Sequence, residues 1–450
     1  MANSTSDFNE NLVKFNVIKA ENKMETKPTI TTFQHYLFFW GGQIFSLLGS
    51  ITVHFLITWY LTETTQNPTV LALARICYIV PLIISSPLAG VFSDRLNRKV
   101  MILIVDSSQA FTTFILIIFM TFGFTYYWIF LIFIIIRNVF QGFHQSTIIA
   151  IIPTMVPKEK LSRINGINLF STGIVQLIGP TLAGTLLAFL RTNFILSVAL
   201  QQALWLDIIT FIIALGPLLV IKIPKVRSKE EKTEKKSFMV EFIEGLSTIW
   251  MVPGAFILLM MGILLNLIIQ PLNVLFPYYV NIIHLGDELD YALFSMGFQA
   301  GIICGSILTT VKKKWNHKIY TSFTSLVLVM MGYMFLAIAP TRAIIVIFLS
   351  EFLMGFFHPI NSTVIQTITQ TTVPHDKLGR ATSIGNAFSL LMIPIGAFLA
   401  GYLVEILGIR LLFFLSAMGG LVIIISLYMF TGIRNIDFDK DHEEGNETII

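Results

Sequence analysis

Charged residues are scarce in this chain of 450 residues: Asp, Glu, Lys and Arg together make up 12% of it, against 55% hydrophobic residues. Soluble domains carry about 25% charged residues, so this composition, with a mean hydropathy of +0.77, excludes an ordinary soluble protein. The net charge of +4 is small and dispersed, unlike the basic patch of a nucleic-acid-binding surface. We therefore expect an integral membrane protein that binds no nucleic acid.

The chain also has few groups for redox, metal or covalent chemistry. Its two cysteines, Cys77 and Cys304, both fall inside apolar runs, so we expect neither a disulfide nor a metal site. The sequence contains no glycine loop for phosphates, no nucleotide-binding motif and no spacing typical of a nucleophile and its base. We expect no enzyme activity, no cofactor and no direct use of ATP.

Long apolar runs dominate the rest of the sequence. A helix needs about 20 apolar residues to span a bilayer, and twelve runs reach that length. They lie at residues 34–61, 69–92, 100–122, 126–152, 161–190, 197–221, 255–283, 291–311, 319–339, 343–369, 378–405 and 411–432. The prediction is an all-α membrane protein with twelve transmembrane helices.

Basic residues are divided unevenly among the connectors between these runs. Of the 30 Lys and Arg residues, Arg191, Arg342 and Arg410 alone lie in connectors on one side, and two more lie within runs. All the others lie on the side that carries both tails. Because basic residues are retained on the cytoplasmic side of membrane proteins, we expect a multi-pass protein of the plasma membrane with both termini in the cytoplasm.

The sequence divides into two similar halves, as internal repeats show. The segment VPKEKLSR at 156–163 recurs as VPHDKLGR at 373–380, an offset of 217 residues (373 − 156), and the same offset relates Gly179 to Gly396 and Ala183-Gly184 to Ala400-Gly401. Such parallel repeats of six spans pack as two pseudo-symmetric six-helix bundles. The two halves are joined by a polar linker that is rich in both charge signs.

This organisation predicts five parts. They are a cytosolic N-terminal tail (1–32), an N-terminal six-helix bundle (33–221), a cytosolic linker with an interfacial helix (222–254), a C-terminal six-helix bundle (255–432) and a cytosolic C-terminal tail (433–450). The interfacial helix is expected over 238–250, where apolar residues recur at helical spacing over too short a length to span. The first apolar run begins near Phe33, later than a cleavable signal peptide would place it.

Polar side chains recur on single helical faces of the first, fourth, seventh and tenth runs. Arg137, Gln141 and His144, for example, share one face by their i, i+4 and i+7 spacing. Because an ionised side chain at mid-helix costs about 2.5–3.5 kcal/mol to insert, we expect these faces to line a central cavity. The cavity residues expected are Gln43, Ser50, His54, Arg137, Gln141, His144, Asn266, Gln270, Asn273, Glu351 and His358. For the amides and hydroxyls, the alternative is hydrogen bonding between helices.

Three further ionisable groups lie inside apolar runs. Asp207, in the sixth run, needs a partner or water for the same reason as Arg137 and Glu351. Asp106 lies near the inner end of the third run and is expected to pair with the adjacent basic loop. Arg75 lies close to the outer surface, so we expect its side chain to reach that surface and assign it no role.

Two segments have a specific order of glycine, proline and charge. Residues 90–99 read GVFSDRLNRK, in which Gly90 permits close helix packing and Asp94 can meet a helix N-terminus. A simple positive-inside loop is the alternative for its basic residues. In the fifth run, Gly179, Pro180 and Gly184 predict tight packing and a bend, with a purely structural kink as the alternative.

These patterns resemble the major facilitator superfamily, and most of all its bacterial macrolide-efflux branch. The landmarks that carry the resemblance are the loop at 90–99, Gln43 with Ser46–Ser50, Arg137 with Gln141-Gly142, Phe143-His144, Val156-Pro157 with Leu161 and its repeat, and Gly179-Pro180 with Gly184. The resemblance implies secondary transport by alternating access, with two bundles rocking around a central site. It further implies proton-driven export of amphipathic compounds.

The resemblance also implies roles for single residues. It makes Gly90, Asp94, Arg95 and Arg98 a conformational latch. From the ionisable groups themselves we expect Glu351 or Asp207 to exchange a proton as cargo leaves, with the two cavity histidines as further groups able to carry protons. The expected partners are an amphipathic small molecule, protons and the lipid bilayer, with the protein as a monomer. Three readings remain open: a lipid or siderophore exporter, a proton-coupled uptake symporter of the same fold, and a non-transporting membrane receptor or scaffold.

Overall fold

The computed structural model describes residues 30–221, 223–224, 246–247, 250–252, 254–312, 315–436 and 438. Within these residues there are helices but no strand. Twelve of the helices are long and apolar enough to cross a membrane, which confirms the prediction from the apolar runs. The expected interfacial helix at 238–250 falls almost wholly outside the described residues.

Within each half of the chain, the membrane-spanning helices follow one another with short connections. They are α2 (Ile30–Thr65), α3 (Pro68–Arg95), α4 (Arg98–Thr121), α5 (Tyr127–Met155), α6 (Leu161–Arg191), α7 (Leu196–Val220), α9 (Ala255–Tyr278, continued by a π-helix at Tyr279–Ile283), α10 (Glu288–Val311), α11 (Lys318–Ile338), α12 (Ile344–Thr372), α13 (His375–Leu407) and α14 (Ile409–Phe430). Short 3₁₀ helices lie at Lys158–Lys160 and Ile433–Asn435.

Local sequence sets where several of these helices begin. The side chain of Asn67 accepts a hydrogen bond from the Thr69 backbone N–H at 2.8 Å, and Pro68 occupies the first turn of α3. Asn97 caps α4 in the same way, and Asp287 opens α10 with a capping box. These residues satisfy backbone N–H groups that the first helical turn leaves free. Connections of one to a few residues therefore suffice, and Gly408, at φ +74°, alone separates α13 from α14.

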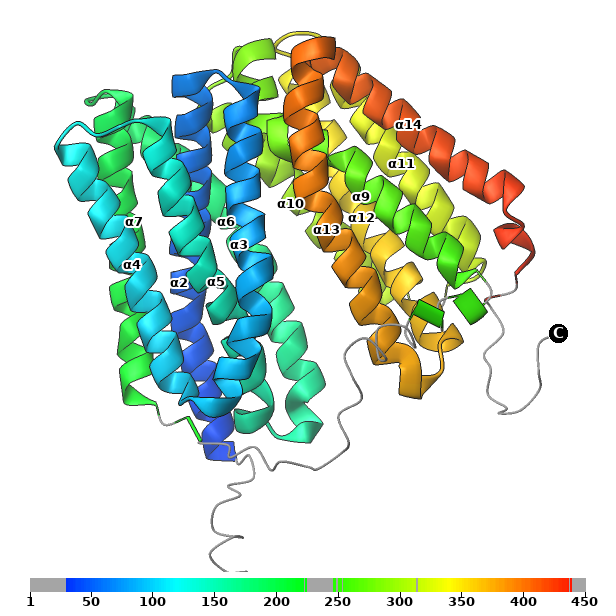
Figure 1. The fold of residues 1–450 in the computed structure, drawn as a ribbon, viewed down its shortest axis with the longest axis horizontal. Helices are drawn as coiled ribbons and strands as arrows, with labels where there is room; N and C mark the ends of the chain where they lie inside the picture. Colours follow the sequence, from blue (N-terminus) through cyan, green and yellow to red (C-terminus); the bar gives the residue numbers. More distant parts are fainter. Residues whose placement is uncertain are drawn as a thin grey trace, which may run out of the picture.

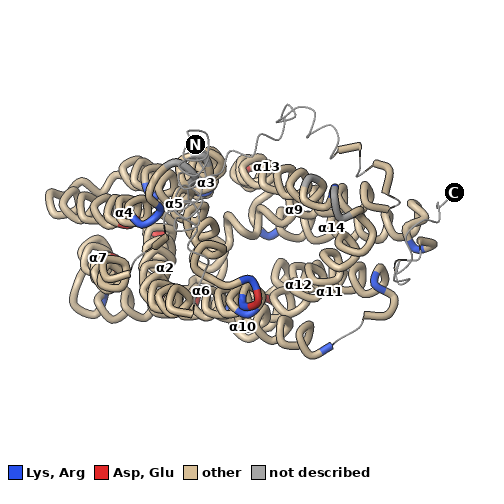
Figure 2. The backbone as a smooth tube through the Cα atoms, turned by 90° about the horizontal axis from the view of Figure 1, so that it is seen from below, with Lys and Arg blue, Asp and Glu red and all other residues tan. Residues whose placement is uncertain are grey.

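The helices form two bundles, with α2–α7 on the left of Figure 1 and α9–α14 on the right. We call the face at which α2 begins and α14 ends the terminal face, at the bottom of Figure 1, and the other the opposite face. Seen from below, charged positions are sparse along the helices of both bundles (Figure 2). Large apolar side chains such as Phe111, Ile212 and Val422 are exposed, which gives the bundles a surface suited to lipid tails.

The glycines of the internal repeat make equivalent contacts in the two bundles. A Cβ at Gly179 of α6 would lie 2.6 Å from Ile51 of α2, and one at Gly396 of α13 would lie 2.5 Å from Gln270 of α9. Gly184 of α6 and Gly401 of α13 instead pack against the other bundle, on α10 and α3 respectively. Each half thus has one equivalent helix pair within its bundle and one equivalent pair with the other bundle, as the sequence repeat predicts.

The bundles meet at the opposite face and diverge toward the terminal face (Figure 1). On α6, Gly184 touches Ala292 of α10, whereas Cβ atoms at Gly173 and Gly166 would meet nothing within 4 Å. Those two glycines precede Gly184 by three and five helical turns, so all three share one face. One helix face is therefore closed against its neighbour at one end and open at the other.

Candidate functional site

A cavity of about 230 Å³ lies within the N-terminal bundle, lined by α2 to α6. Four of the predicted cavity residues line it: Ser50, His54, Arg137 and Gln141. The ring of His54 lies 4.5 Å from that of Tyr78, which also lines the cavity. Further lining residues, not predicted from the sequence, include Gln109, Asn138, Gln145, Thr172 and Gln176. The cavity combines apolar walls with several amides, as small-molecule sites commonly do.

Arg137 forms a buried ion pair with Asp207, which joins α5 to α7. Arg137 Nη1 lies 2.6 Å from Asp207 Oδ2, and both residues are over nine-tenths buried. Arg137 also donates to the Gln109 carbonyl oxygen at 3.2 Å and to the Thr113 hydroxyl, both on α4. Gly49 of α2 leaves room for this pair, since a Cβ there would lie 2.9 Å from Asp207 Oδ1. Asp207 is thus fixed as a counter-charge beside the cavity.

Asp106 was expected to pair with the adjacent basic loop, because it lies near the end of α4. In the structure it pairs instead with two predicted cavity residues. Gln43 Nε2 donates to Asp106 Oδ2 at 3.2 Å, and His144 Nε2 lies 3.4 Å from Asp106 Oδ1. The Gln43 Oε1 atom lies 2.8 Å from the same ring nitrogen. Asp106 faces inward on α4, so the nearest polar groups belong to α2 and α5. Gln43 and His144 lie beside the cavity rather than in its lining.

Arg75 also differs from its prediction. Its guanidinium carbon lies 5.6 Å from the centre of the Tyr78 ring, a cation–π geometry. Its Nε is buried with no hydrogen-bond partner among the described residues, although the residue as a whole is half-buried. Arg75 thus contacts a residue that lines the cavity.

The predicted residues of the C-terminal bundle are less connected. Glu351 of α12 is 6% exposed, and no described residue gives it a hydrogen bond or an ion pair. His358 and Asn273 are exposed and make no side-chain hydrogen bond within the described residues. Asn266 and Gln270 donate to backbone carbonyls of α9 itself. Gln270 packs against Gly396 of α13, so among the described residues it neither lines the cavity nor makes the expected hydrogen bond between helices.

The loop expected to act as a latch is partly described. Arg98 donates to the carbonyl oxygens of Ser93, at 3.2 Å, and Ala150, at 2.7 Å, and so ties the end of α3 to α5. A Cβ at Gly90 would meet nothing within 4 Å, so the close approach expected at Gly90 is not present in this conformation. The side chains of Asp94 and Arg95 lie outside the described part of the chain.

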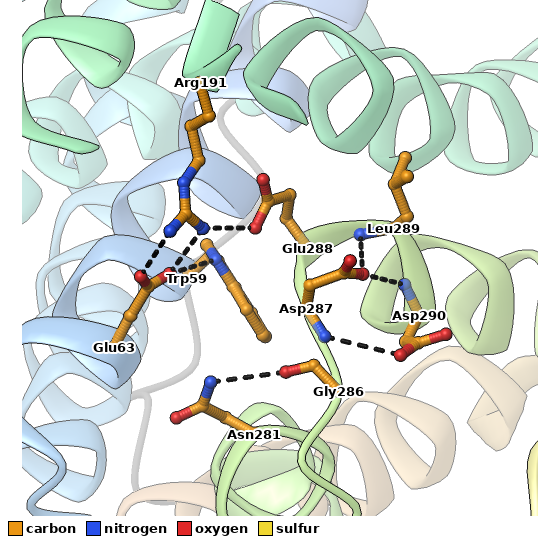
Figure 3. Close-up of polar contacts among 9 residues, drawn as sticks. All are labelled: Trp59, Glu63, Arg191, Asn281, Gly286, Asp287, Glu288, Leu289 and Asp290. Atoms are coloured by element: carbon orange, nitrogen blue, oxygen red, sulfur yellow. Dashed lines mark hydrogen bonds and ion pairs between the residues drawn. The ribbon is translucent and has the colours of Figure 1, made fainter. Parts of the chain in front are cut away.

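Charged residues join the two bundles at the opposite face (Figure 3). Arg191, at the end of α6, lies 2.9 Å from Glu63 of α2 and 2.6 Å from Glu288 of α10. We call these three residues the Arg191 cluster. This cluster was not predicted from the sequence. The signal that could have indicated it is one basic and two acidic residues at helix ends that all lie on the same side of the membrane.

Further cross-bundle contacts surround the Arg191 cluster. The ring of Tyr291 of α10 stacks on Phe55 and Trp59 of α2, with ring centres 4.7 and 5.7 Å apart. Between α3 and α13, the Thr69 hydroxyl donates to Glu405 Oε1 at 2.5 Å. These contacts close the opposite face.

Two similar six-helix bundles, closed at one face around polar groups buried at mid-span, define a membrane transporter of small molecules. The chain belongs to the Major Facilitator Superfamily, whose model matches residues 39–397 and 344–449. It is 26% identical over 400 residues to "Macrolide efflux protein A" of Streptococcus pyogenes, covering 88% of this chain and 96% of that protein.

Another relative and a solved structure agree with this family. The chain is 24% identical over 317 residues to "Macrolide efflux protein A" of Enterococcus faecalis, covering 70% of this chain and 95% of that protein. Its fold is similar to the crystal structure of a bacterial homologue of the iron transporter ferroportin in an inward-facing state. That likeness has a TM-score of 0.66 at 15% identity and covers 89% of this chain and all of that one.

Proposed function

We propose that this protein exports amphipathic small molecules of the macrolide type across the plasma membrane by proton antiport and alternating access. The observation that carries the proposal is the likeness over 400 residues to a macrolide efflux protein. The cavity supports it, because aromatic and aliphatic walls beside amide groups suit an amphipathic ligand. The protein acts as a monomer, since one chain supplies both bundles and the cavity.

The orientation predicted by the basic residues supports export. With both termini in the cytoplasm, the terminal face is cytoplasmic. The open helix faces at Gly166 and Gly173 then belong to an inward-facing conformation, from which an exporter loads its cargo. The Arg191 cluster then closes the outer side.

Of the two carboxyls expected to exchange a proton, Glu351 is the better candidate. Asp207 is held by Arg137 at 2.6 Å, so releasing it would leave a guanidinium buried without a counter-charge. Glu351 has no ionic partner among the described residues, so gaining or losing a proton there breaks no ion pair. We assign Glu351 the coupling role and Asp207 the role of fixing Arg137 beside the cargo.

Susceptibility and flux measurements test this proposal together. Expression should raise the erythromycin concentration that inhibits a drug-sensitive host several-fold, and Asp94→Ala and Glu351→Gln should abolish that protection. In inverted membrane vesicles, erythromycin should accumulate in response to a proton gradient and leave when the gradient is dissipated. Unchanged susceptibility, or proton-driven accumulation in right-side-out vesicles instead, would contradict export and favour the uptake symporter.

A further inference from the structure

Three polar groups from three helices form a closed triangle beside the cavity. His144 Nε2 of α5 faces Gln43 Oε1 of α2 at 2.8 Å and Asp106 Oδ1 of α4 at 3.4 Å. The Gln43 amide nitrogen donates to the other Asp106 oxygen at 3.2 Å. Asp106 is 3% exposed, and its Oδ1 receives no hydrogen bond within the described residues.

The remaining groups around the triangle do not neutralise Asp106. Asp207 of α7, whose charge also acts on Asp106, is itself held in an ion pair with Arg137 of α5. Helix α3 faces this stretch of α5 with Ser85 and Ser86, and neither carries a charge. The carboxylate of Asp106 therefore has one charged partner available to it, the ring of His144.

We infer that His144 and Asp106 form a proton-binding site from which a proton leaves when cargo binds. Gln43 Oε1 requires a hydrogen on His144 Nε2, so an added proton goes to Nδ1 and turns the neutral imidazole into an imidazolium. One N–H bond forms, and the new positive charge lies against the Asp106 carboxylate. Loss of that proton leaves the carboxylate buried and uncompensated, a state that needs other stabilisation.

The position of the pair links its proton to the cargo. His144 is one helical turn from Gln141 and adjacent to Gln145, and both of these line the cavity. Gln109, one turn from Asp106 on α4, lines it too. A ligand that contacts these amides displaces the hydrogen bonds around the triangle. This inference rests on the proposed antiport and adds a proton site in the N-terminal bundle to Glu351 in the C-terminal bundle.

The experiment measures protons released on cargo binding to purified protein in weakly buffered detergent with a pH-indicator dye. It uses the Glu351→Gln background, so that protons from Glu351 are not counted, and erythromycin as the probe. The parent should release about one proton per bound erythromycin. Adding His144→Gln or Asp106→Asn should remove that proton release, while the affinity for erythromycin stays within about threefold of the parent's. The matched control, His35→Gln, changes a histidine of α2 that lies outside the cavity lining and has no carboxylate partner among the described residues, and it should keep the proton release.

A measurement without cargo makes the inference independent of the probe. In ¹⁵N-histidine NMR at one fixed pH without cargo, the ring-nitrogen signals of His144, assigned by their loss in His144→Gln, should be those of an imidazolium in wild type and of a neutral imidazole in Asp106→Asn. Equal proton release with and without His144 and Asp106, or His144 signals that are the same in wild type and Asp106→Asn, would overturn the inference. If erythromycin does not bind but the His144 signals differ as expected, the proton site stands and the proposed cargo is wrong.

Discussion

Arg137 and Asp207 compensate each other where bulk water does not reach either side chain. Replacing Asp207 by Asn leaves a buried guanidinium without its counter-charge, which costs about 3–5 kcal/mol in comparable pairs. We expect Asp207→Asn to lower the unfolding temperature in detergent. The double variant Asp207→Asn with Arg137→Gln should recover most of the lost unfolding temperature. Tryptophan fluorescence during heating measures both. A double variant no more stable than Asp207→Asn would contradict this role of the pair.

His284 predicts a pH effect on stability at the opposite face. Burial and then the nearby Arg410 lower the pKa of His284 to about 4, and its Nδ1 accepts a hydrogen bond from the Arg342 backbone N–H. The unfolded chain, with a His pKa near 6.5, therefore binds the extra proton first as the pH falls. Stability from this group is complete above about pH 6.5 and is lost toward pH 4.

The measurement for His284 compares unfolding temperatures at pH 7.5, 6, 5 and 4. Wild type should lose a few degrees more than His284→Asn over this range, because the Asn oxygen can accept the same backbone hydrogen bond without titrating. Arg410→Gln, which removes the nearby positive charge that lowers the pKa of His284, should make the loss smaller and complete it at a higher pH than in wild type. Identical pH profiles for wild type and His284→Asn would show that His284 binds a proton equally in the folded and unfolded states, so that folding does not lower its pKa.

Polar residues inside apolar runs were predictable from the sequence, but their partners were not. The i, i+4 and i+7 spacing placed Arg137, Gln141 and His144 on one face. In the structure the first two line the cavity, whereas His144 pairs with Asp106. Partner choice depends on how each helix is rotated against its neighbours. A single sequence does not contain that rotation.

At the scale of helices, the face of α6 that carries three glycines gives a matched comparison. A Cβ at Gly184 would lie 2.6 Å from Ala292 Cβ and 2.8 Å from the Glu288 carbonyl oxygen, whereas Gly173 faces open space. We expect Gly184→Ala to force α6 away from α10 and to destabilise the closed opposite face, and Gly173→Ala to leave it unchanged.

Cysteine accessibility measures that difference between the two glycine variants. A cysteine at Tyr291, stacked between the bundles, should react with a membrane-impermeant maleimide several-fold faster in Gly184→Ala than in Gly173→Ala, with Cys77 and Cys304 replaced in both. Equal rates would mean that the helices absorb the added methyl group by a local shift.

The helices themselves follow closely from the sequence, because length and hydropathy decide whether a segment spans a membrane. Their ends do not. The first helix was predicted over 34–61 but runs over Ile30–Thr65, because polar residues such as Glu63 and Thr64 continue it past the apolar run. Glu63 thereby reaches Arg191. The contacts at the opposite face depend on such polar extensions, which hydropathy does not detect.

At the scale of the whole molecule, the repeat relates the contacts that hold the bundles together. Gly184 and Gly401 are repeat partners, and each lets α6 or α13 pack against the first helical turns of α10 or α3 in the other bundle. A polar contact accompanies each packing: Arg191 with Glu288, and Thr69 with Glu405. The two halves thus close one face with symmetric pairs of helices but different side chains, so charge is concentrated at one of the two equivalent contacts.

That asymmetry predicts which side chain controls opening. Glu288 is the partner of Arg191 in the other bundle, whereas Glu63 shares a bundle with Arg191 (Figure 3). Glu288→Gln removes the cross-bundle charge pair, which for a partly exposed pair is worth about 1 kcal/mol, or about fivefold in the population open at this face.

Spin labels at Asn193 and Ile345, in a background without native cysteines, report the distance between the bundles by electron paramagnetic resonance. The longer-distance population should rise about fivefold in Glu288→Gln and clearly less in Glu63→Gln, because the latter keeps the pair that bridges the bundles. Equal distance distributions in wild type and Glu288→Gln would assign closure to the Tyr291 aromatic stack instead.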